Sequence, residues 1–138
     1  MKRIGASGFF VACLVGLGPA SVVTGQEAGP RTLFSAPLAD MPGMQLVVVE
    51  LKLPPKQDAR PQSPGHRHPG SVYVYVTEGI VRLGLEGQPV KEVAAGGSFF
   101  EPLGAIHTVT ESASPTQPAA AIAVMIVPDG APLVTAVQ

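Results

Sequence analysis

Tryptophan is absent from this sequence, cysteine occurs once, and charged residues are few. Of the 138 residues, 14% are charged and 5% are aromatic, and the formal net charge is −1. A nearly neutral chain lacks the basic surface with which proteins bind nucleic acids, so we expect no nucleic-acid partner. Because Cys13 is the only cysteine, no disulfide can join two parts of the chain, and stability must come from a packed core.

Residues that break helices are abundant instead. The chain contains 16 glycines and 15 prolines between short apolar runs, and 46% of its residues are hydrophobic. Glycine and proline interrupt helices and mark the turns between strands. A length of 138 residues suits one domain with one core. The composition therefore predicts a single-domain, turn-rich, all-β fold.

Residues 1–25 have the pattern of a signal peptide. Lys2 and Arg3 give a positively charged start, an apolar run extends from Phe9 to Leu17, and the small residues at 23–25 offer a cleavage site. The apolar run is too short to serve as a membrane span. We therefore expect a periplasmic or secreted protein that has no membrane attachment after the signal peptide is removed.

The pattern of strands and turns divides the remaining chain into three parts. Residues 26–43 contain a polar lead-in (26–30), which we expect to be mobile, and a first short strand (32–35). Residues 44–127 form a β-barrel, and residues 128–138 form a C-terminal tail. Seven or eight runs of strand character at regular spacing, without a credible helix, are typical of a sandwich or barrel.

Two of the three histidines stand two residues apart, just before a run of β-branched and aromatic residues that predicts a strand. On a strand, His66 and His68 share one face with Cα atoms roughly 6.6 Å apart, so both imidazoles can reach one cation. The third histidine, His107, also lies at a turn that leads into a β-branched run. We predict that the three imidazoles meet around a divalent transition metal. Iron, manganese, nickel, copper and zinc all suit such ligands.

The histidines lie in two motifs that resemble those of the cupin superfamily. Seven residues match at the expected spacing: His66, His68 and Gly79 in the first motif, and Gly96, Pro102, Gly104 and His107 in the second. The resemblance covers residues 44–127 and implies a jelly-roll β-barrel with a metal bound by the histidines. Within the superfamily, the chain resembles the small quercetin-dioxygenase-like proteins.

The chain departs from the cupin pattern at the metal-binding carboxylate. The position of the first motif's glutamate falls on Val72, or on Tyr73 in the other allowed spacing. The resemblance therefore implies a site of three histidines, unless another carboxylate takes that place. Glu101 and Glu111 are candidates, because strand alternation puts both on the side of the histidines. Each could instead be a salt-bridge residue at the rim.

The resemblance implies a metal-dependent enzyme that acts on a small organic molecule. A divalent ion held by neutral imidazoles is a strong Lewis acid and favours an anionic or oxygen-bearing ligand. Whichever of Glu101 and Glu111 faces the cavity would be the catalytic general base. Dioxygenase chemistry and lyase chemistry both suit such a site. The alternative is a non-catalytic periplasmic protein that binds a metal or a small ligand.

Alternation also predicts what lies beneath the metal and what lies outside. The residues with the parity of the histidines should line an apolar pocket: Val72, Val74 and Val76, joined by Phe99, Val109 and Met125. Tyr73 and Tyr75 have the opposite parity and should lie on the outer face. There they could form the contact surface of a homodimer, or be exposed tyrosines without consequence.

Overall fold

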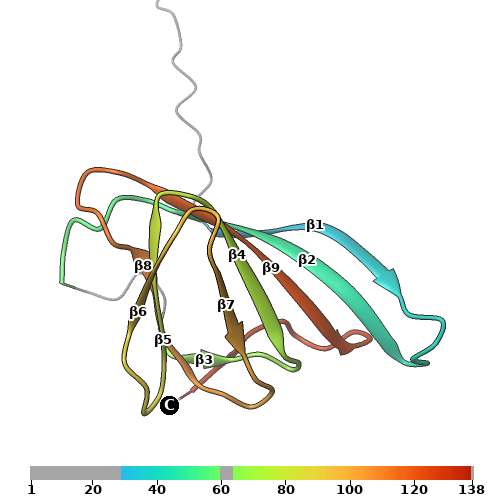
Figure 1. Ribbon diagram of the computed structural model, residues 1–138. Coiled ribbons are helices and arrows are strands. Elements are labelled where there is room, and N and C mark those ends of the chain that lie inside the picture. The colour runs from blue at the N-terminus through green and yellow to red at the C-terminus, as the bar shows by residue number, and fades with distance from the viewer. Residues whose placement is uncertain (1–28, 60–63, 138) are drawn as a thin grey trace, which may run out of the picture.

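The computed structural model describes residues 29–59 and 64–137, which form ten β-strands in two sheets (Figure 1). The signal peptide predicted for residues 1–25 lies outside the described residues. Within the two described ranges, no helix is long and apolar enough to cross a membrane. All paired strands are antiparallel, and the predicted all-β jelly-roll fold is confirmed.

Each sheet contains five strands. The first has the order β1 (Gly29–Pro37), β2 (Met44–Leu53), β9 (Ala119–Pro128), β4 (Val72–Glu78) and β7 (Ser98–Glu101). The second has the order β10 (Thr135–Ala136), β3 (His66–Arg67), β8 (His107–Ser112), β5 (Ile80–Leu85) and β6 (Lys91–Ala94). Figure 1 shows β3, which carries one of the histidines and ends just before another, at one end of the fold.

The inner faces of the two sheets pack against each other. On β4, Val72, Val74 and Val76 are at most 1% exposed, whereas the alternate residues Tyr73 and Tyr75 are 46% and 43% exposed. The same core contains Phe99, Met125 and the inner residues of β5, which are Val81, Leu83 and Leu85. Burying one such side chain stabilises a fold by about 1.5–3 kcal/mol. The predicted faces of β4 are therefore confirmed, and they hold the two sheets together.

The N-terminal strand is longer than the sequence predicts. β1 begins at Gly29 and pairs with β2 along its length, from Gly29 opposite Lys52 to Pro37 opposite Gln45. The last two residues of the predicted mobile lead-in are thus part of a sheet. Pro30 fits there because β1 is an edge strand, and an edge strand does not need every N–H for pairing.

The region predicted as a C-terminal tail also contributes a strand. Thr135 lies opposite Arg67, and Ala136 lies opposite His66, so β10 extends the second sheet beside the histidines. The red C-terminal segment in Figure 1 returns to β3 after the end of β9. Two residues are too few to show a strand period in the sequence, which is why this pairing was not predictable.

A bulge in β8 changes which of its side chains face the interior. His107 lies opposite Leu85 of β5, but Val109 lies opposite the preceding residue, Gly84, so Thr108 is an extra residue in β8. The bulge reverses the alternation after His107. Because cross-strand neighbours share a face, Val109 points outward with Gly84. The prediction that Val109 lines the interior is therefore wrong.

The same bulge separates Glu111 from the histidine face. Thr110 lies opposite Leu83, which is fully buried in the core, whereas Glu111 lies opposite Arg82 on the other face of the strand. The expectation that Glu111 shares a face with His107 is wrong, because simple alternation does not continue through a bulge.

The outer face of the first sheet carries a continuous apolar row. Five side chains lie in register from β1 to β7: Phe34, Val48, Val124, Tyr73 and Phe100. The three aromatic members are 52%, 46% and 59% exposed, in chain order Phe34, Tyr73 and Phe100. Exposed apolar patches of this kind are typical of contact surfaces. A homodimer that uses this face stays a prediction.

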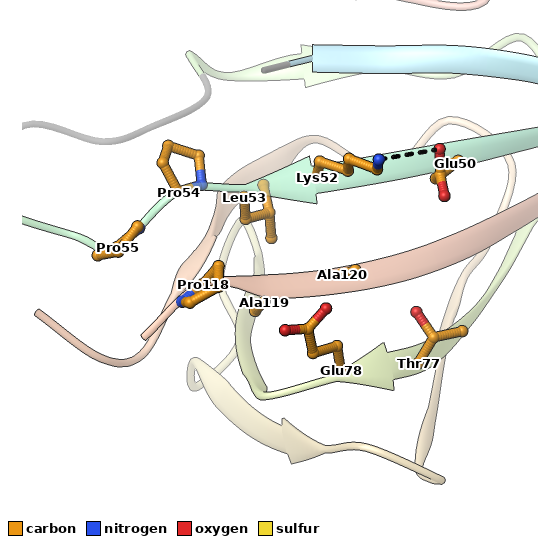
Figure 2. Close-up of a pocket in the computed structure, with 10 residues that line it drawn as sticks. All are labelled: Glu50, Lys52, Leu53, Pro54, Pro55, Thr77, Glu78, Pro118, Ala119 and Ala120. Carbon is orange, nitrogen blue, oxygen red and sulfur yellow. Dashed lines mark ion pairs between the residues drawn. The ribbon is translucent and has the colours of Figure 1, made fainter. Parts of the chain in front are cut away.

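A groove of about 510 Å³ lies where β2 ends and β9 begins (Figure 2). Lys52, Ala120 and Glu78 are neighbours across β2, β9 and β4 at this groove. Lys52 and Glu50 form an ion pair of 4.0 Å along its wall. None of the lining residues is a histidine, so the groove is separate from the predicted metal centre.

Candidate metal centre

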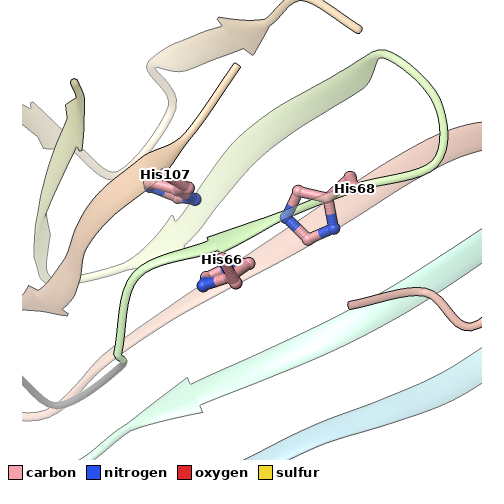
Figure 3. Close-up of side chains that lie close together, drawn as sticks. All are labelled: His66, His68 and His107. Atoms are coloured by element: carbon pink, nitrogen blue, oxygen red, sulfur yellow. The ribbon is translucent and has the colours of Figure 1, made fainter. Parts of the chain in front are cut away.

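The structure brings together the three histidines that the sequence singles out (Figure 3). His66 on β3 and His107 on β8 lie directly opposite each other, and His68 follows one residue after β3 ends. The ring centroid of His66 is 4.8 Å from that of His68 and 5.2 Å from that of His107. One ligand atom of each ring lies within 4.8 Å of the other two.

The position of β3 depends on the turns that enclose it. A Pro-Gly pair precedes the histidines at 64–65, and another follows them at 69–70. Proline cannot donate a backbone hydrogen bond, so these pairs limit the strand to two residues. At Gly70, a Cβ atom would overlap the carbonyl oxygen of Ile126 on β9. The absence of a side chain at Gly70 therefore lets the histidine segment lie close against the first sheet.

Backbone carbonyls orient two of the imidazoles. Nδ1 of His66 lies 2.8 Å from the carbonyl oxygen of Pro64, and Nδ1 of His68 lies 2.7 Å from that of Leu133. A carbonyl oxygen only accepts, so Nδ1 carries the hydrogen in both rings and the lone pair is on Nε2. This arrangement presents Nε2 of each ring as the atom that can bind a metal.

Burial favours the metal-binding form of His66. Removal of its imidazole from water lowers the pKa of His66, and the hydrogen bond to Pro64 partly opposes this shift. The lowered pKa means that His66 is uncharged in a larger fraction of molecules near neutral pH, and only an uncharged imidazole can act as a metal ligand.

Glu101 and Thr110 complete the surroundings of His107. Oε2 of Glu101 lies 3.1 Å from Nδ1 of His107 and 3.7 Å from Nε2 of His68. The hydroxyl of Thr110 lies 3.1 Å from Nε2 of His107. Thr110 was not predicted as a site residue, because simple alternation from His107 would place its side chain on the outer face. The cupin motifs gave no signal for it.

Glu111 lies among different neighbours. Its carboxylate is 2.6 Å from the ammonium of Lys56 and 2.7 Å from the guanidinium of Arg82. The side chain is buried, and the two cations compensate its charge. Of the two glutamates predicted as candidates, the structure therefore brings Glu101 to the histidines and holds Glu111 in an ion-pair network on the other face of β8.

The residues present fit a divalent transition metal. Nitrogen ligands bound at about 2.1 Å to one ion, with angles of about 90–110°, lie roughly 3.0–3.4 Å apart. The three imidazoles have ligand atoms within 4.8 Å of one another, so an approach of about 1.4 Å between the most distant pair brings them to that range. A buried carboxylate beside them adds a negative charge that favours a cation. The site could therefore hold a metal ion through His66, His68 and His107.

A chain that ends at Ala131 should bind metal more weakly although its barrel remains folded. It would lack the Leu133 carbonyl that orients His68 and the β10 strand that pairs with β3. Loss of the outer partner of a metal-binding histidine typically costs about 10–100-fold in affinity. Titration with Zn²⁺, followed by calorimetry, should give a decrease of that size.

A pair of point variants tests the attachment of the C-terminal segment beside the histidines with less change to the core. The N–H of Val137 donates to the carbonyl oxygen of Gly65 at 3.1 Å. Val137→Pro removes this donor, whereas Val137→Ala keeps it. We expect weaker Zn²⁺ binding in the proline variant than in the alanine variant. If both variants and the truncated chain bind Zn²⁺ as tightly as the wild type, β10 does not support the site.

Comparisons with other proteins agree with the geometry. Residues 51–125 match the sequence profile of the cupin domain. A solved structure of an uncharacterized conserved protein with a double-stranded β-helix domain from Klebsiella pneumoniae is similar, with a TM-score of 0.60, 19% identity, and coverage of 83% of this chain and 88% of that chain. A cupin domain from Bordetella pertussis has a TM-score of 0.53 and 23% identity, with coverage of 72% of this chain and 92% of that chain.

A third similar structure is the DMSP lyase DddQ from Ruegeria pomeroyi, with a TM-score of 0.53 and 21% identity. The alignment covers 66% of this chain but only 42% of the lyase. At these identities, the structural comparisons support the fold alone. The comparison with curated proteins finds no match. Because the profile match covers more than half of the chain, the protein belongs to the cupin family.

Proposed function

We propose that the protein is a metal-dependent enzyme of the cupin family that acts on a small organic molecule. His66, His68 and His107 hold a divalent transition metal, and Glu101 accepts a proton from the substrate. One observation carries the proposal. A buried carboxylate oxygen lies 3.1 Å from one imidazole and 3.7 Å from another, within a cluster of three histidines. An ion held by these histidines would place a Lewis acid beside this base, and these are the two groups that proton-abstraction chemistry needs.

The chemistry supported best is that of a lyase. The bound metal would supply Lewis acidity toward a carboxylate, enolate or hydroxyl group. Glu101 is held by β7 next to the histidines and is 3% exposed, so bulk water does not compete strongly for its carboxylate. Dioxygenase chemistry is the second enzymatic option, and it additionally needs a redox-active ion such as iron, manganese, copper or nickel.

A non-catalytic role is favoured by the low exposure of the site. His66 is 8% exposed and His107 is 3% exposed, so a bound ion would be largely enclosed by protein. An enclosed ion with no position for a substrate is typical of a structural or storage site. The alternative function is therefore that of a protein that binds a metal or small ligand without turnover.

We also propose that the protein acts after export, in the periplasm or outside the cell. The support is the positively charged start, the apolar run and the small residues within positions 1–25. N-terminal sequencing of the exported protein should begin near Gln26. An intact Met1 on the active protein would contradict export by this signal.

Replacement of the native ion by Co²⁺ tests the enzymatic proposal directly. The visible absorption of Co²⁺ depends on its ligands, so azide or acetate should change the spectrum if the ion has an open position. An enzyme site should respond, because substrate needs that position. A Co²⁺ spectrum that is insensitive to both anions would favour the non-catalytic role. Failure of the protein to retain any divalent ion would contradict metal binding altogether.

A further inference from the structure

The structure contains two glutamates that are equally buried but differently compensated. Glu101 is 3% exposed and Glu111 is 4% exposed. Glu111 lies between two permanent cations, Lys56 and Arg82. Among the described residues, the ion-pair partners of Glu101 are the imidazoles of His68 and His107, which carry no fixed positive charge. An ionised carboxylate is unfavourable in a protein interior unless a cation compensates it. Glu111 therefore has its charge compensated by two cations, whereas the charge of Glu101 could be compensated by a metal ion.

The distances around Glu101 are close to those between ligands of one metal ion. Ligand atoms that bind one ion at about 2.1 Å, with angles of about 90–110°, lie roughly 3.0–3.4 Å apart. Oε2 of Glu101 is 3.1 Å from Nδ1 of His107 and 3.7 Å from Nε2 of His68. The first distance falls within that range and the second exceeds it by about 0.3 Å, so a small movement of this oxygen would bring it to the spacing of a fourth ligand.

The strand register relates Glu101 to the position where the cupin motif places its carboxylate. Val72 on β4 lies directly opposite Glu101 on β7, and both are buried. Directly opposed residues point to the same face of a sheet with Cβ atoms about 4.5–5.5 Å apart. A glutamate side chain can span that separation. A carboxylate from position 101 can therefore reach the same region as a carboxylate from position 72.

We propose that Glu101 is the fourth metal ligand, and that the carboxylate of this site has moved by one strand, from the position of Val72 to the position of Glu101. The inference rests on the proposed function, since it requires the three histidines to hold an ion. A carboxylate ligand lowers the charge of the site, because three neutral imidazoles and one carboxylate around a divalent ion give a net charge of +1. With Oε2 as ligand, Oε1 of the same carboxylate can accept the proton.

Exchange of the two residues tests this proposal. The double variant Val72→Glu/Glu101→Val returns the carboxylate to β4 without a change of composition or net charge. Zn²⁺ affinity is measured by competition with a chelator for this variant, the wild type, Glu101→Gln and the control Glu111→Gln. Glu101→Gln should bind Zn²⁺ about a hundredfold more weakly, and the double variant should recover to within about tenfold of the wild type. Glu111→Gln should bind Zn²⁺ like the wild type.

Each outcome has a distinct meaning. If Glu101→Gln binds Zn²⁺ as tightly as the wild type, Glu101 is not a ligand. If Glu101→Gln is weak but the folded double variant does not recover, Glu101 acts by orienting His107, and the proposal is overturned. Should circular dichroism show that the double variant is unfolded, Glu101→Asp replaces it as the test, and its affinity must exceed that of Glu101→Gln. Absence of Zn²⁺ binding in the wild type would instead overturn the proposed function.

Discussion

Replacement of any one of the three histidines by alanine should lower the affinity for a divalent metal by about a hundredfold or more. Tetrahedral zinc sites in small proteins contribute about 10–16 kcal/mol in total, so each of four ligands accounts for roughly 3 kcal/mol. His66, His68 and His107 should show similar losses because their nitrogens converge on one region. Metal titration of the three variants, with Zn²⁺ or Co²⁺, gives the measurement.

Thermal unfolding provides an independent measurement with a matched control. Zn²⁺ at one hundred times its dissociation constant stabilises a protein by about 2.7 kcal/mol, which raises Tm by roughly 10 °C for a domain of this size. Arg67 lies between two of the histidines and is exposed, so Arg67→Ala should keep the full shift. The histidine variants should show little or none. If a histidine variant shows the full increase of Tm with Zn²⁺, the replaced histidine is not a metal ligand.

Gly79→Ala should destabilise the fold far more than the same change at Gly87. Both glycines have positive φ, +66° and +72°, so an alanine at either position is strained by roughly 1–2 kcal/mol. At Gly79, the new Cβ would also lie 2.5 Å from the carbonyl oxygen of Pro118, whereas nothing lies within 4 Å at Gly87. Overlap with a backbone that must then shift should add about 2–3 kcal/mol.

Urea denaturation of the two variants separates the strain from the overlap. The free energy of unfolding should fall by about 1–2 kcal/mol for Gly87→Ala and by about 3–5 kcal/mol for Gly79→Ala. Gly79 joins β4 to β5, and its neighbour Pro118 directly precedes β9. A loss at Gly79 no larger than that at Gly87 would mean that this contact between the turn and the start of β9 is readily relaxed.

The fold and the three histidines were largely predictable because they depend on local patterns. Alternation along β4 gives its inner and outer faces directly, since side chains on a strand have a period of two. The pair His66 and His68 needs only the same period to share a face. The motif that contains His107 fixes its place after a turn. None of these inferences requires knowledge of which strands are neighbours.

The errors and omissions all come from relationships between distant strands. Val109 and Glu111 were placed on the wrong face because the extra residue Thr108 becomes visible only when β8 is paired with β5. Thr110 was missed for the same reason. The contact of Leu133 with His68 joins residues 65 positions apart, and no local pattern predicts it.

Glu101 shows the limit of sequence interpretation most clearly. Strand alternation allowed Glu101 to face the histidines, but it allowed the same for Glu111. The distinction depends on the register of two strand pairs, one opposite Val72 and one opposite Arg82. Register is set by the whole sheet, through packing and turn geometry, so it becomes known only with the fold.

The position of Leu133 in the chain has a consequence for the time at which the site forms. The three histidines, Glu101 and Thr110 all precede it, so the carbonyl that orients His68 is the last of these groups to be synthesised. A nascent chain on the ribosome cannot complete the centre until residue 133 has emerged. The complete centre would therefore bind its ion only after residue 133 has emerged, and the identity of the ion would depend on the metals available in the compartment where this part of the chain folds.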